Sequence, residues 1–424
     1  RYFSGHNSNE IVDYAKLNEN GPYDVNKDSN TKMPPLLNTR EDRENLLRLR
    51  ARLGMKAIIS PEWTAGIRVG TGNDNSPVSA NQTLGGGFGK KDLWLDQGYL
   101  SWKAMPGLTL TGGRFANPFY STDMMYSKDL NFDGIAANFN HTLNKDWGVF
   151  ATLGAFPVEY SSDTASSNGL DKEDSKNKWM FGGQIGADWK LNSDNSLKGA
   201  LAYYRFEDLE GKRSAPCKPW QGQPGCDTDG SRLTFMQKGN TVFLLRDIVP
   251  NPDTPGLTPQ PQFVGLASKF DVLDLNLAWD TQLPENLMLR TQGNYIRNLS
   301  YNKGKMLKRS EGEIVNNLNS SGEFESGGNA MMLQFTLGNA LEMRKRGDWN
   351  VLAGYKYIQP DALPDGFNDS SFHLGGTNAK GYFVGGSYGI DKNIYASARW
   401  LSASEVYGAP FEVDVMQLEL NTRF

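Results

Sequence analysis

Three arginines stand at alternate positions in the segment LLRLRARLGMK, residues 46–56: Arg48, Arg50 and Arg52. On an extended strand, residues i and i+2 share a face about 6.7 Å apart, so three such guanidinium groups form a ladder about 13 Å long. A helical repeat fits the same residues less well. Fixed cations attract anions in water, whereas each arginine facing lipid near the bilayer midplane costs about 2–4 kcal/mol. We therefore expect the ladder to line a water-filled space.

Two further arginines could extend this basic wall. Arg68 follows the alternation of its own segment and lies on its polar face. Arg114 shares its face with Leu108 and Leu110, so a β-bulge or a change of register is needed to turn it toward the other arginines. We predict both arginines in the wall, with Arg114 subject to that condition.

The same alternation recurs along the chain and indicates strands. In KWMFGGQIGADWK, residues 178–190, Trp179, Phe181 and Ile185 share one face, and Gln184 and Asp188 share the other. Fifteen segments show the pattern: 45–59, 62–70, 93–103, 108–115, 132–143, 147–155, 178–190, 196–206, 272–280, 286–295, 328–338, 348–357, 380–390, 394–402 and 412–424. A sixteenth strand is needed if both termini lie on one side of a membrane, and the initial RYFSG is the candidate.

Connections of two lengths alternate between these segments, which is the pattern of an up-and-down sheet. Tight turns occur at one end, and the long polar loops at the other are 71–92, 116–131, 157–177, 207–262, 303–327, 359–379 and 403–411. Tryptophans such as Trp63, Trp102 and Trp147 stand at strand ends, which is typical of the aromatic girdles of membrane barrels. We predict an all-β, transmembrane, antiparallel up-and-down β-barrel of sixteen strands, with short periplasmic turns and long extracellular loops. A large soluble β-protein is the alternative.

Composition excludes several other classes of protein. The chain has 424 residues, and its net charge of −4 argues against nucleic-acid binding. No stretch approaches 18 consecutive apolar residues, so a transmembrane helix is not expected. The three histidines, His6, His141 and His373, are too scattered for a zinc site or a catalytic relay, and we predict neither enzymatic activity nor a cofactor. DVNKDSN, residues 24–30, has the oxygen spacing that begins a calcium loop but lacks its glycine and distant glutamate, so a polar turn is favoured over bound Ca²⁺.

The longest connection, 207–262, contains both cysteines. Cys217 and Cys226 bracket CKPWQGQPGC, which predicts a disulfide and an oxidising compartment; two unrelated reduced thiols are the alternative. The same loop contains NTVFLLRDIV, residues 240–249, which is too apolar to extend freely into water. We expect this loop to fold inward, to cap the barrel from outside, or to pack on a neighbouring subunit.

Two segments resemble known outer-membrane proteins. The end of the chain, MQLELNTRF, alternates up to Phe424 and resembles the C-terminal signal read by the barrel-assembly machinery of Gram-negative bacteria. The stretch LWLDQGYLSWKAMPGLTLTGGRFANPFYSTDMMYSKDLNFDGIA, residues 93–136, resembles the "putative porin" family. That resemblance implies a diffusion porin in the outer membrane that assembles as a homotrimer. Its expected partners are outer-membrane lipids, lipopolysaccharide, small hydrophilic solutes and, through Phe424, the assembly machinery.

By analogy with general porins, the loop at 116–131 is expected to fold into the barrel. Its Asp123 and Asp129 would then face the arginines and create a transverse field; the alternative is that both are ordinary surface acids. The whole chain, 1–424, is expected to form one barrel domain, in which residues 1–44 supply the end of the first strand and a long first loop. Other charges expected to face the lumen are Lys56, Asp188, Arg290, Lys356 and Glu419.

These features predict passive diffusion of small hydrophilic solutes with a weak preference for anions. Acidic residues on other strands, Asp188, Asp274, Asp280 and Glu419, could cancel that preference. Two other functions stay open. One is a substrate-specific channel or receptor whose lumenal site is built from loop 207–262. The other is a structural or adhesive barrel with an occluded lumen.

Overall fold

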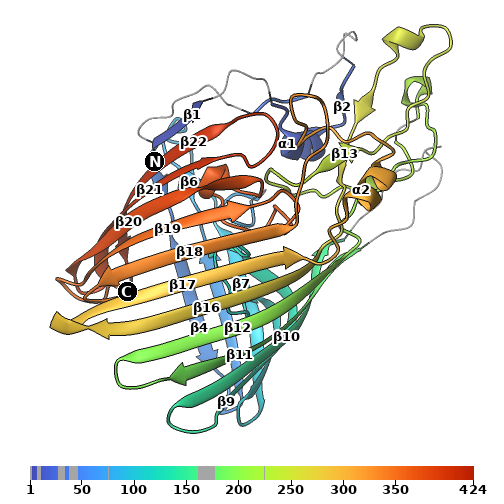
Figure 1. Cartoon of the computed structure of the whole chain (residues 1–424). Coiled ribbons are helices and arrows are strands. Elements are labelled where there is room, and N and C mark those ends of the chain that lie inside the picture. The colour runs from blue at the N-terminus through green and yellow to red at the C-terminus, as the bar shows by residue number, and fades with distance from the viewer. Residues whose placement is uncertain are drawn as a thin grey trace.

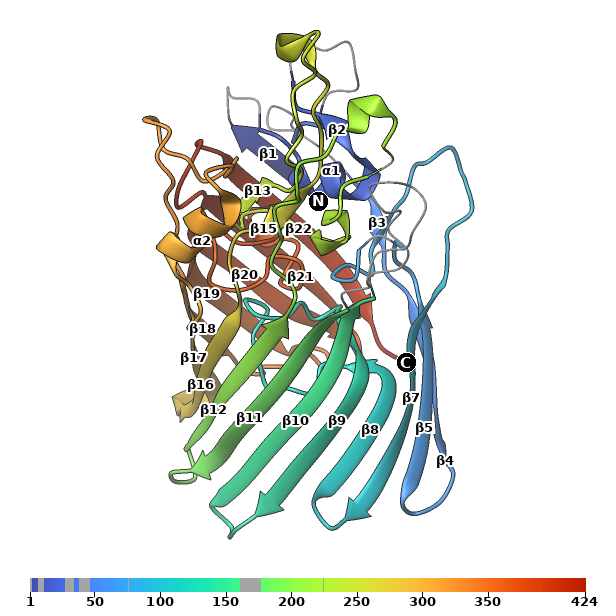
Figure 2. The ribbon, with the colours of Figure 1, turned by 90° about the vertical axis from the view of Figure 1, so that its right-hand side faces the viewer.

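The computed structural model describes residues 2–6, 11–26, 34–37, 46–74, 76–160, 177–223 and 225–424, and the fold is all-β and antiparallel. One sheet forms a curved wall, with long loops gathered at one end and short turns at the other (Figures 1 and 2). Its sixteen strands are hydrogen-bonded in the order β1-β22-β21-β20-β19-β18-β17-β16-β12-β11-β10-β9-β8-β7-β5-β4.

The strands of this sheet are β1 (Tyr2–His6), β4 (Arg52–Ile58), β5 (Trp63–Gly70), β7 (Trp94–Met105), β8 (Leu108–Ala116), β9 (Asn131–Thr142), β10 (Trp147–Glu159), β11 (Lys178–Lys190), β12 (Asn195–Glu207), β16 (Asp271–Leu283), β17 (Leu287–Asn298), β18 (Asn329–Gly338), β19 (Trp349–Ile358), β20 (Ala379–Asp391), β21 (Ile394–Ser404) and β22 (Glu412–Thr422). The loops contain the helices α1 (Tyr14–Asn20) and α2 (Lys303–Ser310). They also contain the short strands β2 (Tyr23–Asp24), β3 (Arg48–Leu49), β6 (Gln82–Thr83), β13 (Val242–Leu244), β14 (Pro261–Gln262) and β15 (Val264–Leu266). Among the described residues, neither α-helix has the length and apolarity needed to cross a bilayer.

Strands β1 and β4 are the two edges of the sheet. The initial segment pairs antiparallel with the C-terminal strand, Tyr2 opposite Met416 and His6 opposite Glu412. On the other edge β4 pairs with β5. Across the ranges that the structure describes, no pairing joins β1 to β4, so the hydrogen-bonded ring is not closed.

Side chains alternate between the two faces of the sheet as the sequence predicts. Leu53, Met55 and Ile67 are 67%, 68% and 50% exposed, because their face of β4 and β5 packs against nothing. Near the short turns, paired tryptophans stack on neighbouring strands: the ring centroids of Trp147 and Trp189 are 4.8 Å apart. The outer face is therefore largely apolar, with aromatic side chains toward its ends.

The predicted arginine ladder is interrupted. Strand β4 begins at Arg52, and Arg48–Leu49 pairs instead with Gln82–Thr83 of the loop between β5 and β7. This loop folds back over the chain, and the amide of Leu84 donates to the carbonyl of Leu47 (2.9 Å). Segment 45–59, whose first residue lies outside the described ranges, alternates from Leu47 onward but is not one strand of the large sheet.

Arg114 does not join the other arginines. The register of β8 with both neighbours runs without a shift from Leu110 to Arg114, so Arg114 keeps the outward face of Leu110. Its Nη1 donates to Asp133 Oδ2 (2.9 Å), a residue on the same outer face as the 65% exposed Ile135. This placement corrects the expectation that a bulge turns Arg114 into the basic wall.

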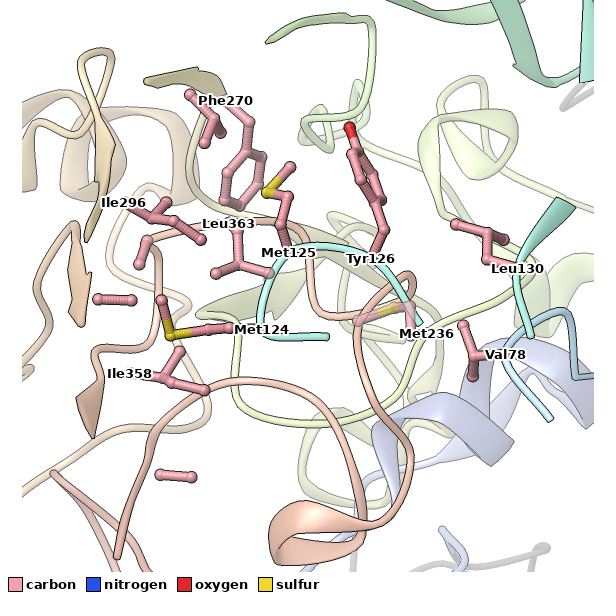
Figure 3. Packing of buried hydrophobic residues seen from close by; sticks show 14 of the residues in the cluster. Val78, Met124, Met125, Tyr126, Leu130, Met236, Phe270, Ile296, Ile358 and Leu363 are labelled. Atoms are coloured by element: carbon pink, nitrogen blue, oxygen red, sulfur yellow. The ribbon is translucent and has the colours of Figure 1, made fainter. Parts of the chain in front are cut away.

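The main core lies on the inner side of the sheet, where the segment 116–131 packs against strand side chains. Phe119 and Tyr126 of this segment meet the rings of Phe132, Phe156 and Tyr204 at centroid distances of 5.0–6.2 Å. Figure 3 shows Met124, Met125 and Tyr126 among side chains from distant parts of the chain, including Ile296 and Ile358. The apolar residues of 116–131 therefore fix this segment inside the wall.

The loop after β12 folds into an assembly with other long loops. Within it Phe243 and Leu245 are fully buried and pack with Met306 and Phe324 of the loop after β17. Asn18 of α1 donates to the carbonyl of Val264 (2.9 Å) and accepts from its amide (2.9 Å). The apolar stretch 240–249 thus packs against neighbouring loops of the same chain. Nearer its tip, Cys217 and Cys226 form a disulfide bond (S–S 2.05 Å).

Two buried carboxyls join this assembly to the loop after β19. Asp361 accepts hydrogen bonds from the amide of Thr241 (3.0 Å), from its hydroxyl (2.6 Å) and from the hydroxyl of Ser326 (2.5 Å). Asp365 accepts from the amides of Asn240 (3.3 Å) and Gln237 (3.4 Å). Burial raises the pKa of each carboxyl from 3.8 to about 6.

These raised pKa values predict a loop assembly that is more stable in mild acid. A carboxyl with a raised pKa binds protons more tightly in the folded state, so its contribution is complete below about pH 4 and is lost as the pH rises through 6. We expect the free energy of local opening at Thr241 to fall by roughly 2 kcal/mol per carboxyl between pH 4 and pH 7.5. Lys238 nearby, whose pKa burial lowers to about 8, titrates above this window. Hydrogen exchange of loop amides, corrected for intrinsic rates, measures the change. Asp361→Asn should reduce the change in opening free energy between pH 4 and pH 7.5. An equal pH dependence in that variant would show that the raised pKa does not belong to Asp361.

Candidate solute pathway

The segment 116–131 leaves β8, crosses the inner side of the sheet and returns to β9. Near its start Asn117 accepts from the amide of Phe119 (2.9 Å) and donates to Ser121 Oγ (2.8 Å), which fixes a turn that directs the chain inward. The amide of Tyr120 then donates to Gln184 Oε1 of β11, and the carbonyl of Tyr120 accepts from Gln184 Nε2 (both 2.8 Å).

The next residues of this segment reach strands far along the sheet. Thr122 Oγ1 donates to Asn294 Oδ1 of β17 (2.5 Å). Asp123 forms an ion pair with Lys356 of β19 (2.8 Å), whose side chain is 2% exposed and lies over the rings of Phe372 and Phe383. Because β8 and β19 are widely separated in the strand order, the segment spans the inner side of the wall.

Asp123 remains charged in this position. Burial raises its pKa, but the positive charges of Lys356, Arg399 and Lys128 outweigh that effect and hold the pKa below its ordinary value. The structure therefore brings Asp123 to Lys356, which the sequence predicted separately as lumenal, and not to the arginines of 46–56.

Asp129, at the other end of the segment, does meet the arginines. Its Oδ1 lies 3.2 Å from Arg50 Nη1 and 3.1 Å from Arg52 Nη2, and its Oδ2 accepts from the amide of Ala80 (3.1 Å). Arg48, which is held in β3, also interacts with Asp129: burial lowers the pKa of Arg48, and the carboxylate opposes that shift. Asp129 thus contacts Arg50 and Arg52 directly and acts on Arg48 through its charge.

Asp96 completes the cluster and was not predicted. Its Oδ2 lies 3.1 Å from Arg52 Nε and 2.5 Å from Arg68 Nε. Asp96 is the extra residue at a register shift, since Arg68 pairs with Gln97 and Val69 with Leu95. The signal was present in the sequence, because exposed Leu95 and Leu100 are five positions apart and cannot share a face of a regular strand.

A cavity of about 430 Å³ lies between this cluster and the opposite strands. Six side chains on its lining matter for solutes: Arg52, Arg68, Asp123, Lys128, Gln292 and Gln334. Three of them are cations and one is an anion already paired with Lys356, so the lining carries excess positive charge. The amides of Gln292 and Gln334 supply neutral donors and acceptors on the far side.

The remaining charges predicted for the lumen are mostly paired or exposed. Asp188 lies 3.2 Å from Lys198, and Arg290 lies 2.6 Å from Asp280, both across neighbouring strands. Glu419 Oε2 accepts from Ser397 Oγ at 3.4 Å. Lys56 is exposed on β4. None of these four lines the 430 Å³ cavity within the described residues.

Residues 24–30, considered for calcium, are only partly described. Asp24 Oδ1 accepts from the amides of Asn26 (2.8 Å) and Gln260 (2.9 Å), so this carboxylate stabilises a turn and the short β2–β14 pair. Asp28 and Asn30 lie outside the described residues.

The sequence of the entire chain, residues 1–424, matches the profile of the family described as "putative porin". The chain belongs to this family. Family membership supports a general porin or channel role for the chain. No curated protein matches the sequence.

Several solved structures are similar to this family member at low identity. The outer-membrane channel DcaP of Acinetobacter baumannii shares 9% identity over 99% of this chain and 94% of its own, with a TM-score of 0.39. OmpF of Salmonella typhi, in complex with daunomycin, shares 10% identity over 90% and 93%, with a TM-score of 0.42. OmpT of Vibrio cholerae with loop L8 deleted shares 10% over 88% and 97%, with a TM-score of 0.40. These three TM-scores are below 0.5, so the function of this chain is inferred from its own residues.

Proposed function

We propose that this porin-family chain is a passive diffusion channel for small hydrophilic solutes, with a weak preference for anions set at a charged constriction. The segment 116–131 forms that constriction, and the cluster of Arg48, Arg50, Arg52 and Arg68 forms its basic wall. The proposal is based on the position of the segment 116–131. Its Asp123 is fixed to Lys356, and its Asp129 is fixed to Arg50 and Arg52. The 430 Å³ space left beside it exposes cations to a passing solute.

The expected anion preference is weak because acidic residues neutralise much of the positive charge. Asp96 and Asp129 offset two of the four arginines in the basic wall. The acids on other strands also have basic partners, as in the Arg290–Asp280 and Lys198–Asp188 pairs. The remaining excess positive charge acts in water, where a unit charge at 4 Å contributes only about 1 kcal/mol. A channel of this kind needs no catalytic group and no cofactor.

The membrane also dictates closure of the sheet. In hydrocarbon every backbone N–H and C=O must be paired, so an open edge such as β4 is not tolerated there. We propose that β1 and β4 complete a sixteen-stranded barrel, with the short turns in the periplasm and the long loops outside the cell. The alternating C-terminal segment, which includes Phe424, supports recognition by the assembly machinery, and the family resemblance supports a homotrimer.

Planar bilayer recordings test the proposed channel. With purified wild-type protein and a KCl gradient, we expect discrete conductance steps and a reversal potential showing a weak preference for chloride. Strong cation selectivity would contradict the basic wall as the selecting element. A complete lack of conductance would favour the occluded, structural barrel instead.

A second cavity favours a substrate-specific channel as the other candidate. It has a volume of about 360 Å³ and lies among the loops, where Tyr14, Lys238, Asn316, Glu405 and Tyr407 are part of its lining. Lys238 Nζ lies 2.5 Å from His373 Nδ1 and 3.9 Å from Glu405 Oε1, so the cavity has charged groups beside amide and apolar side chains. Current block by a solute at micromolar concentration, lost in Lys238→Met, would favour this function over general diffusion.

A further inference from the structure

The cavity of about 360 Å³ lies where several long loops meet, and its lining comes from segments far apart in the chain. Tyr14 belongs to the first loop, Lys238 to the loop after β12, and Glu405 to the loop between β21 and β22. Figures 1 and 2 both show α1 and β13 among the loops at this end of the wall. Sites for small molecules have volumes of about 300–1,000 Å³, so this cavity suits a compact ligand.

Lys238 supplies a cation to this cavity. Its Nζ donates to His373 Nδ1 (2.5 Å), while His373 Nε2 donates to the carbonyl of Phe411 (2.9 Å). Burial and the charge of Lys238 lower the pKa of His373, so the ring is neutral at pH 7 and accepts at Nδ1. Because burial lowers the pKa of Lys238 only to about 8, its ammonium is still mostly charged at pH 7. His373 uses one of its three N–H groups, and within the described residues Nζ forms no other hydrogen bond.

The carboxylate of Glu405 lies beside this cation. Its Oε1 is 3.9 Å from Lys238 Nζ and 3.4 Å from His373 Nε2, and its side chain is 13% exposed. Its Oε2 has no hydrogen-bond partner in the described part of the chain. Asp13 and Asp365, which also line the cavity, already accept from backbone amides. Glu405 is therefore the acid of the lining that has capacity for a further donor.

Apolar side chains and hydrogen-bonded amides form the walls of the cavity. Val12, Val315 and Leu318 supply apolar surface. Asn317 donates to a carbonyl of the loop after β12 (3.0 Å) and accepts from Asn378 Nδ2 (3.0 Å). These bonds join the loops after β12, β17 and β19, so the walls are fixed before a ligand arrives and binding orders few groups.

The charges of the lining disfavour a ligand that carries a single charge. A simple anion is attracted by Lys238 but repelled by the carboxylates of Glu405 and Asp365, and a simple cation is repelled by Lys238. A zwitterion can form a charge-assisted hydrogen bond with each partner. The ammonium and the carboxylate of an α-amino acid are attached to one carbon, which suits the short distance between Lys238 and Glu405.

We propose that this cavity binds an α-amino acid with an apolar side chain. The carboxylate of the ligand contacts Lys238, its ammonium contacts the carboxylate of Glu405, and its side chain packs against the apolar walls. The inference names the solute class for the substrate-specific function considered above and rests on that function. A general diffusion channel needs no such site, because its solutes pass without specific binding.

Isothermal titration calorimetry on detergent-solubilised, full-length protein tests the site with four probes: L-leucine, 4-methylpentanoate, 3-methylbutylamine and glycine. The second probe is leucine without its ammonium, the third is leucine without its carboxylate, and glycine lacks the side chain. L-leucine should bind at micromolar concentration, and each singly charged probe at least tenfold more weakly. Glycine should bind about 10–100-fold more weakly than leucine, because burial of a leucine side chain contributes about that factor.

A charge variant makes the test specific. Glu405→Gln keeps the size of the side chain and removes its charge, so it should weaken L-leucine binding at least tenfold. The same variant should bind 4-methylpentanoate more tightly than wild type, because the repulsion between two carboxylates is lost. Misfolding cannot produce a gain for one probe and a loss for another. The matched control is Glu311→Gln, since Glu311 is 66% exposed and lies outside the lining; it should bind every probe like wild type.

Three results would overturn the site: wild type binding L-leucine no better than 4-methylpentanoate, Glu405→Gln binding L-leucine as tightly as wild type, or an equal loss in Glu311→Gln. Conductance of the wild-type preparation separates this inference from the proposed channel. Open channels without leucine binding would reject the amino-acid site and leave the diffusion channel standing. Micromolar block by a singly charged solute, lost in Lys238→Met, would keep the substrate-specific channel and reject its assignment to amino acids. Leucine binding without conductance would support the site and reject the channel.

Discussion

Replacing Arg52 and Arg68 together by glutamine is expected to convert the weak anion preference into a cation preference. Both side chains line the 430 Å³ cavity, and both are paired with Asp96. The double substitution removes two positive charges beside Asp96 and Asp129. The new glutamine side chains still supply hydrogen-bond donors. Two unit charges about 8 Å from a solute in water change its local concentration by about fivefold. We expect the chloride-to-potassium permeability ratio to fall by at least that factor.

The matched control removes two arginines from the outer surface. Arg114 and Arg205 pair with Asp133 and Glu207, outside the basic wall. The double variant Arg114→Gln with Arg205→Gln should keep the wild-type reversal potential in 0.1 M salt, where the screening length is about 10 Å. An equal shift in both double variants would show that net charge, and not position at the constriction, sets selectivity.

Replacing Lys356 by methionine is expected to release the segment 116–131 from the far side of the wall. Lys356 is the direct ionic partner of Asp123, and its side chain is only 2% exposed. Removing one partner of a buried ion pair typically costs about 3–5 kcal/mol, because the other buried charge loses its direct partner. We expect a lower temperature of unfolding on heat-modifiability gels, together with larger and noisier single-channel currents.

Two further variants make this prediction specific. Lys198 also faces inward from its strand, but it pairs with the 54% exposed Asp188, and exposed pairs contribute about 0–1 kcal/mol. Lys198→Met should therefore leave unfolding nearly unchanged. Asp123→Asn added to Lys356→Met removes the uncompensated charge and should restore part of the lost stability. Wild-type behaviour of Lys356→Met alone would show that the ion pair does not hold the segment.

The strands were predictable because a two-residue period is a local property. The segment KWMFGGQIGADWK has the bounds of β11, Lys178–Lys190, and its outward tryptophans stack as the pattern indicates. Alternation alone, however, does not reveal where a strand leaves its sheet. Arg48 continues the period of β4 yet belongs to β3, since its partner strand lies in a loop whose pairing depends on the complete fold.

The constriction was predictable only in part. Analogy placed 116–131 inside the barrel, and Asp129 does lie beside Arg50 and Arg52. The partner of Asp123 could not be inferred, because Lys356 is 233 positions away and the contact depends on the curvature of the sheet. Helix α2 was also missed: an eight-residue helix inside a polar loop is stabilised mainly by one buried side chain, Met306, which local sequence does not identify.

The most direct test of the account is whether 116–131 lies in the conduction path. Ser121 lines the 430 Å³ cavity, and the two native cysteines are joined in a disulfide, so Ser121→Cys introduces a single reactive thiol. Adding a membrane-impermeant, positively charged thiol reagent to open channels should lower the single-channel conductance and further favour anions; a negatively charged reagent should shift selectivity toward cations. If modification goes to completion and leaves both conductance and reversal potential unchanged, the segment is not the constriction.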